Sequence, residues 1–149
     1  MGTIFDVALF IVDELGEMST MKLQKLCYYA QAWSLAWDGV PLFEEDFQAW
    51  ANGPVCKELY DIHKGQFSVI ADDIAPHSSG YEFTSDEAES LEVVINDYGD
   101  KEAFWLSELT HQERPWRETR GNTPLGERSN AIISKELMQE YYSGLIGHG

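Results

Sequence analysis

Lysine and aromatic side chains recur along one stretch of this sequence at the spacing of a helix. Lys22, Lys25, Tyr29 and Trp33 follow one another at intervals of three and four residues. At about 100° per residue they fall in a band about 80° wide that borders the apolar face of the helix. Positive charge beside aromatic rings is typical of surfaces that bind another protein. We therefore interpret these four as candidate partner-binding residues.

A second concentration of positive charge lies in the last third of the chain. Arg114, Arg117, Arg120 and Arg128 supply four of the ten basic side chains, and His111 stands just before them. His111, Arg114 and Arg117 join the candidate partner-binding residues. The alternative for each basic residue is that it only offsets nearby carboxylates, in exposed ion pairs that contribute less than about 1 kcal/mol each.

The residue patterns of common active sites are missing from the sequence. There is no glycine-rich phosphate loop and no serine in a nucleophile elbow. His111-x-Glu113 matches the first half of a zinc deaminase motif, but the Pro-Cys-x-x-Cys half is absent. Neither the cysteines nor the histidines have the spacing of metal ligands: Cys27, Cys56, His63, His77, His111 and His148. We expect no catalytic site, no metal and no cofactor.

Acidic residues outnumber basic residues by 26 to 10, which gives a formal net charge of −16. Because this charge repels phosphate, it argues against direct binding to nucleic acid and to anionic membranes. The longest apolar run, Val7 to Val12, is too short to span a membrane, and no Lys or Arg precedes it as in a secretory signal. These features predict a soluble, cytoplasmic protein and favour a partner that is itself basic.

The hydrophobic residues that must position these groups are mostly at helical spacing. The chain has 149 residues, 44% of them hydrophobic and 13% aromatic, enough for one compact domain with its own core. Periodic apolar residues predict about six helices, near residues 4–15, 20–37, 54–64, 85–98, 103–109 and 134–146. Residues 47–51 and 81–83 are expected as two strands that pair, and residues 65–80 and 119–130 as loops. The expected fold is mainly α, with a small two-stranded β element.

Capping and turn residues indicate where several elements begin. Thr3 with Asp6 forms an imperfect capping box, and Thr84-x-x-Glu87 forms a good one. Asn52-Gly53-Pro54 is a turn. Pro54 suits the first position of the next helix, because its missing N–H costs nothing there. We interpret this turn as structural.

Three separated motifs follow one another in the sequence. The first is Lys22-Leu23-Gln24-Lys25-Leu26-Cys27-Tyr28-Tyr29-Ala30-Gln31-Ala32-Trp33. The second comprises Pro41-Leu42-Phe43, Ala49-Trp50, Asn52-Gly53-Pro54-Val55 and Tyr60. The third is Leu106-Ser107-Glu108-Leu109-Thr110-His111 with Pro115-Trp116. In this order and spacing they resemble the Panacea domain, the SocA-like antitoxin family that includes GepA-type phage-associated proteins. The resemblance covers about residues 4–120 of a single domain, 1–149, whose last helix is expected at about 134–146.

The resemblance implies a mostly helical antitoxin of a toxin–antitoxin system. Such domains neutralise a cognate protein toxin by direct binding, and the SocA type delivers its toxin to a cytosolic protease as an adaptor. Neither role needs catalysis, so the chain is expected not to be an enzyme. Five of the matching residues are expected to be structural: Gly53, Pro54, Thr110, Pro115 and Trp116. Four others either contact the toxin or hold the fold: Lys22, Lys25, Tyr29 and His111.

Two other functions are compatible with the sequence. A phage-encoded acidic interaction protein could imitate nucleic acid, with exposed carboxylates spaced like phosphates and no toxin encoded beside it. An enzyme of an unfamiliar type would need a deep pocket that holds His111 beside a carboxylate of perturbed pKa. A structure with His111 buried and fully hydrogen-bonded to backbone would argue against the enzyme.

Overall fold

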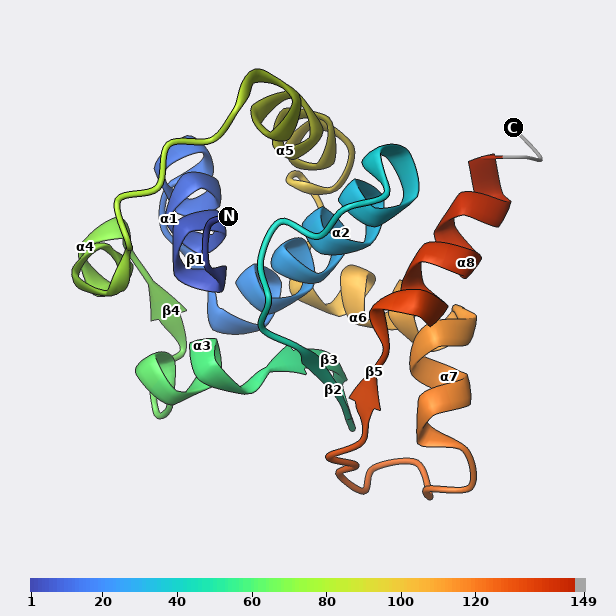
Figure 1. Cartoon of the computed structure of the whole chain (residues 1–149). Coiled ribbons are helices and arrows are strands. Elements are labelled where there is room, and N and C mark those ends of the chain that lie inside the picture. Colours follow the sequence, from blue (N-terminus) through green and yellow to red (C-terminus); the bar gives the residue numbers. More distant parts are fainter. Residues whose placement is uncertain (147–149) are drawn as a thin grey trace.

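Helix α2 (Thr20–Asp38) forms the centre of the molecule. The computed structural model describes residues 1–146. In it, α1 (Ile4–Leu15) and α5 (Ser85–Tyr98) pack on one side of α2 and α8 (Lys135–Ile146) on another (Figure 1). Because neighbours surround it, α2 buries most of its side chains, including polar ones such as Gln24, Lys25 and Gln31.

The remaining elements are short. The other helices are α3 (Lys57–His63), α4 (Ala71–Ile74), α6 (Ala103–Gln112) and α7 (Arg114–Arg120), with a 3-10 turn at Ala75–His77. The strands are β1 (Met18–Ser19), β2 (Phe47–Trp50), β3 (Gly53–Cys56), β4 (Ser68–Val69) and β5 (Ile132–Ile133). The mainly helical class is confirmed, but residues 1–146 contain eight α-helices and two small antiparallel sheets. Of the helices in this range, none is both long and apolar enough to cross a membrane.

Side chains placed just before the helices explain where three of them begin. The Asp6 carboxylate accepts the Thr3 backbone N–H at 2.7 Å, and the Thr3 hydroxyl accepts the Asp6 backbone N–H at α1. Thr84 and Glu87 make the same reciprocal box at α5. Ser19 accepts the backbone N–H of Lys22 at α2. Each bond satisfies an N–H that the first helical turn leaves free, and both predicted capping boxes are confirmed.

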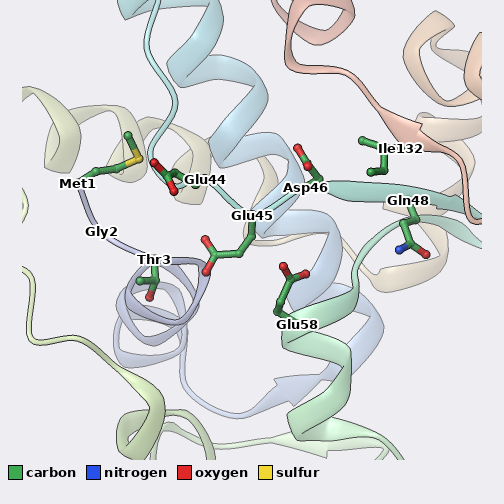
Figure 2. Close-up of a pocket in the computed structure, with 9 residues that line it drawn as sticks. All are labelled: Met1, Gly2, Thr3, Glu44, Glu45, Asp46, Gln48, Glu58 and Ile132. Carbon is green, nitrogen blue, oxygen red and sulfur yellow. The ribbon is translucent and has the colours of Figure 1, made fainter.

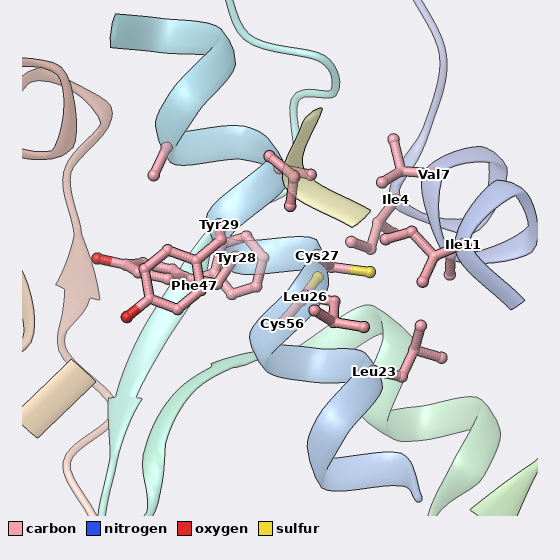
Figure 3. Packing of buried hydrophobic residues seen from close by; sticks show 14 of the residues in the cluster. Ile4, Val7, Ile11, Leu23, Leu26, Cys27, Tyr28, Tyr29, Phe47 and Cys56 are labelled. Atoms are coloured by element: carbon pink, nitrogen blue, oxygen red, sulfur yellow. The ribbon is translucent and has the colours of Figure 1, made fainter. Parts of the chain in front are cut away.

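One cluster of buried apolar residues fills the space around α2 (Figure 3). Val7 and Ile11 of α1 belong to it, together with Leu23 on the facing side of α2. Towards the β2–β3–β5 sheet, the rings of Tyr28 and Phe47 pack edge to face with centroids 5.4 Å apart. Helix α2 therefore buries side chains in two directions, and removal of this apolar surface from water is the main favourable contribution to folding.

The structure corrects the expected strand pairing. β2 forms a hairpin with β3 and pairs along its other edge with β5, whereas residues 81–83 lie outside any strand. A two-residue loop joins the paired residues Trp50 and Gly53, so the hairpin closes at a lower entropic cost than a distant pairing. The expectation of Pro54 at a helix start is also wrong, because Pro54 lies in β3 and α3 begins at Lys57. β3 is at the edge of its sheet, where a residue without an N–H is tolerated.

Two segments expected as loops contain regular structure. Residues 65–80 include β4, α4 and the 3-10 turn, and they bury Val69 and Ile74 in the core. Helix α7 was not expected and reaches Arg120, inside the predicted loop 119–130; Pro115 suits its first turn. Helix α8 agrees with the predicted last helix. His148 lies outside the described residues.

Candidate functional site

Lys25 lies at the point where α2, the β2–β3 hairpin and α6 meet. Its side chain is completely buried, and Nζ donates to the carbonyl of Pro54 at 3.2 Å. A Cβ on Gly53 would lie 2.5 Å from Cε of Lys25 and 2.9 Å from Oγ1 of Thr110, so only glycine fits there. Thr110 in turn donates to the carbonyl of Ser107 at 2.7 Å. Members of all three motifs thus form one tightly packed junction in the interior.

Burial changes the protonation of this lysine. An ammonium group loses its hydration in the interior, and this lowers the pKa of Lys25 from 10.5 to about 7. Lys25 is therefore not a fixed surface cation of the kind that the helical band suggested. It holds the hairpin turn through the Pro54 carbonyl.

Tyr29, one turn further along α2, belongs to a second buried junction. Its hydroxyl and that of Tyr142 each donate to Oε1 of Glu113 at 2.7 Å, and the Tyr28 hydroxyl lies within hydrogen-bond distance of the Tyr142 oxygen, at 3.2 Å. Burial raises the pKa of Glu113 above its ordinary value, although the two tyrosine hydrogen bonds act in the opposite direction. Tyr29 is fully buried, so it connects α2 with α8 through the residue between α6 and α7.

Helix α7 is fastened to the hairpin by two of its side chains. The indole N–H of Trp116 donates to the carbonyl of Trp50 at 2.8 Å. The Arg120 guanidinium donates to the carbonyl of Ala49 at 2.9 Å and lies 4.8 Å from the centre of the Trp116 ring. Pro115, Trp116 and Arg120 are all buried. The five residues predicted to be structural therefore all lie in the interior: Gly53, Pro54, Thr110, Pro115 and Trp116.

Lys22 and Trp33 stand at the border between interior and surface and both reach α5. Nζ of Lys22 donates to the carbonyl of Gly99 at 2.6 Å, just beyond the end of α5. The indole of Trp33 donates to the hydroxyl of Tyr98 at 2.9 Å and stacks on Trp37. The four residues of the predicted band share one face of α2, but the fold places them in two different environments. Lys25 and Tyr29 face the interior, and Lys22 and Trp33 brace α5.

His111 lies partly exposed at the end of α6, where its ring stacks on Trp116 with centroids 4.1 Å apart. Burial lowers the pKa of His111, the nearby Glu108 carboxylate acts in the opposite direction, and the positive charges of Lys25 and Arg120 lower the pKa further. Its Nε2 atom is buried and has no hydrogen-bond partner within residues 1–146. His111 is thus not the fully buried histidine, hydrogen-bonded to backbone, that would have argued against an enzyme.

Arg114 and Arg117 are the two candidate residues that lie on the surface. Arg114 pairs with Glu118 on the next turn of α7 at 3.2 Å. A nitrogen of Arg117 donates to the carbonyl of Gln112 at 3.4 Å. Both guanidinium groups stay exposed to solvent, so a partner could reach them without any rearrangement of the interior.

A cavity of about 620 Å³ is lined by none of the predicted site residues. It opens beside the start of α1, and four carboxylates surround it (Figure 2): Glu44, Glu45, Asp46 and Glu58. Lys135 neutralises part of this charge through a 2.7 Å contact with Asp46. The acidic run Glu44-Glu45-Asp46 is a sequence feature that could have indicated this cavity, whereas Glu58 joins it only through the fold. Three further buried residues of these junctions had no role predicted from the sequence: Glu113, Arg120 and Tyr142.

These features define a helical protein whose three sequence motifs pack together in a common interior. Within the described residues, no group of three or more His, Cys, Asp or Glu side chains could hold a metal ion. The chain belongs to the family of SocA-like antitoxins, Panacea domain, whose family model matches residues 23–117, more than half of the chain. The resemblance seen in the sequence is therefore confirmed. Comparison with curated proteins and with solved structures gave no match.

The matched range contains most of the junction residues. Lys25, Tyr29, Gly53, Thr110 and Glu113 lie inside residues 23–117. Lys22, Arg120 and the whole of α8 lie outside it, although they contact the matched part through the bonds described above.

Proposed function

We propose that this chain is an antitoxin that neutralises a cognate protein toxin by binding it directly. The family match over residues 23–117 is the observation that carries this proposal, because antitoxin is the function that defines the family. The arrangement of the motifs supports it: they pack into a rigid interior and leave the surface to recognise a partner.

The negative charge of the chain supports the proposal that the toxin is a basic protein. With a net charge of −16, the chain attracts a positively charged protein over a distance, which speeds encounter and rejects acidic competitors. Nucleic acid would be repelled by the same field. The charge thus favours a protein toxin over nucleic acid as the binding partner.

Direct occlusion of the toxin is the simplest mechanism, and delivery of the toxin to a cytosolic protease is the second. Occlusion needs only a stable complex. Delivery needs, in addition, a toxin that disappears faster when the antitoxin is present. The half-life of the toxin in cells, with and without the chain, separates the two mechanisms.

Co-expression tests the function. A reading frame adjacent to the gene for this chain is expressed alone and together with the chain in a bacterial host. We expect growth arrest in the first case, recovery in the second, and co-purification of the two proteins. Continued arrest in cells that contain the folded chain would count against the antitoxin function. Recovery without co-purification would count against direct binding.

A further inference from the structure

The first turn of α6 presents two aromatic side chains to solvent. Phe104 is 74% exposed and Trp105 is 46% exposed, whereas Leu106, Ser107 and Thr110 on the other face of the same helix are buried. The outward face continues with Glu108 and Gln112. A surface helix normally places polar residues on this face, and a largely exposed phenylalanine beside a half-exposed tryptophan is uncommon. We call Phe104 and Trp105 the α6 aromatic pair.

Contacts within the chain hold Trp105 and the turn that precedes α6. Nζ of Lys101 lies 5.0 Å from the centre of the Trp105 ring and covers one of its faces. Lys22 fastens the preceding turn through its 2.6 Å bond to the carbonyl of Gly99. Gly99 also packs closely, since a Cβ there would lie 3.0 Å from a methyl group of Leu15. Fixing side chains before a partner arrives lowers the entropic cost of binding.

Carboxylates flank the pair along the sequence. Between Glu82 and Glu108 the sequence has nine acidic residues and one basic residue, Lys101. Asp100, Glu102 and Glu108 are exposed close to the pair in sequence. The surface therefore consists of an apolar aromatic centre with an acidic border, the arrangement in which central aromatic residues supply most of the binding energy.

The negative charge around the α6 aromatic pair decides which kind of partner could bind there. A second copy of the chain would bring an equally acidic border against this one, and an anionic membrane would be repelled in the same way. A protein with an apolar pocket bordered by Lys or Arg matches both the centre and the border. We propose that the α6 aromatic pair is the docking point for the toxin, and that the toxin receives it in such a pocket. This inference rests on the proposed antitoxin function.

Binding measurements on two variants of the full chain test the docking point. The probe is the product of the adjacent toxic reading frame, purified in an inactive form. F104A alone, and F104A with W105A, should weaken binding by about 30-fold or more and should abolish growth rescue. The melting temperature of F104A should remain close to that of the wild type, because Phe104 is 74% exposed and contributes little to the interior.

A matched control removes exposed apolar side chains elsewhere. Phe67 and Leu125 are each 86% exposed and lie in other segments, so F67A with L125A should bind the toxin like the wild type. Wild-type affinity in the α6 variants, or an equal loss in the control, would overturn the docking assignment while the antitoxin function stands. Failure of the wild-type chain itself to bind would instead overturn the proposed function. A dimer of the chain that F104A dissolves would show that a second copy covers this face.

Discussion

At the scale of single residues, Lys25 is the side chain whose environment differs most from what its type suggests. A charged ammonium group loses its hydration when it is buried, so burial favours the neutral amine and lowers the pKa of Lys25 to about 7. In the unfolded chain the same group has a pKa near 10.5. Between these values the unfolded chain binds more protons than the folded one, so this group makes folding more favourable as the pH rises from 7 to 10.5.

Lys25→Met should remove this pH dependence. Methionine fills a similar volume without an ammonium group, so the variant should fold. Between about pH 7 and pH 10 the free energy of unfolding of the wild type should rise, relative to that of the variant, by up to about 1.4 kcal/mol per pH unit. Denaturant titrations at several pH values measure the difference. Lys57→Met is the control, because Lys57 is exposed and pairs with Asp61 at the surface, and it should keep the wild-type slope. Equal slopes for wild type and Lys25→Met would contradict a buried, titrating lysine.

At position 53, both the backbone angle and the neighbouring atoms exclude any residue other than glycine. Its φ of 118° is unfavourable for any side chain, and a Cβ would overlap Lys25 and Thr110. Gly53→Ala should therefore lower the free energy of unfolding by about 3 kcal/mol. Gly126→Ala is a matched control with φ of 87° and open space around the Cβ, and it should cost only about 1 kcal/mol. Thermal melts that rank the two variants in the reverse order would show that the junction is loosely packed.

The place of Lys25 and Tyr29 on their helix could be predicted from the sequence, but the elements that surround them in the fold could not. Helical spacing correctly grouped Lys25 and Tyr29 with the apolar border of α2. Periodicity describes one helix, however, and says nothing of how many neighbours cover it. Because α8 and the β2–β3 hairpin close over this side of α2, residues that resembled a surface rim became part of the interior.

At the scale of elements, α8 depends on a contact that links three separate segments. Tyr142 donates to Glu113 at 2.7 Å, and Glu113 also accepts the hydroxyl of Tyr29. Tyr142→Phe would leave a buried carboxylate with one donor fewer, so the free energy of unfolding should fall by about 1–3 kcal/mol. Tyr141→Phe, on the neighbouring position of the same helix, should be nearly neutral, since its hydroxyl takes no part in the Glu113 cluster. Equal stability of both variants in chemical denaturation would show that α8 is held by apolar packing alone.

Elements with local signals were predicted well, and elements that depend on distant partners were not. The capping residues Thr3 and Thr84 mark α1 and α5 correctly because a cap contacts only its own helix. Strand β5 has two residues and exists only where it meets β2, so no local pattern identified it. The pairing of residues 81–83 with β2 was wrong for the same reason: strand pairing depends on which segment the fold brings close.

At the scale of the whole molecule, the charge of −16 and the α6 aromatic pair make different contributions to binding a toxin. Long-range attraction acts before contact and mainly raises the association rate. The aromatic side chains act after contact and mainly lower the dissociation rate. Changing the salt concentration distinguishes the long-range attraction from the aromatic packing, because salt screens exposed charges beyond about 10 Å but leaves apolar packing in place.

Raising the salt concentration from about 50 to about 500 mM should therefore lower the association rate with the toxin by about tenfold or more, while the dissociation rate changes little. Surface plasmon resonance at several salt concentrations measures both rates. Glu102→Gln with Glu108→Gln should make the association rate less dependent on salt, because it removes two charges from the border of the proposed docking point. Phe104→Ala should leave the salt dependence unchanged and raise the dissociation rate instead. If the border variant kept the full salt dependence, the toxin would be attracted by carboxylates elsewhere, such as those around the cavity beside α1.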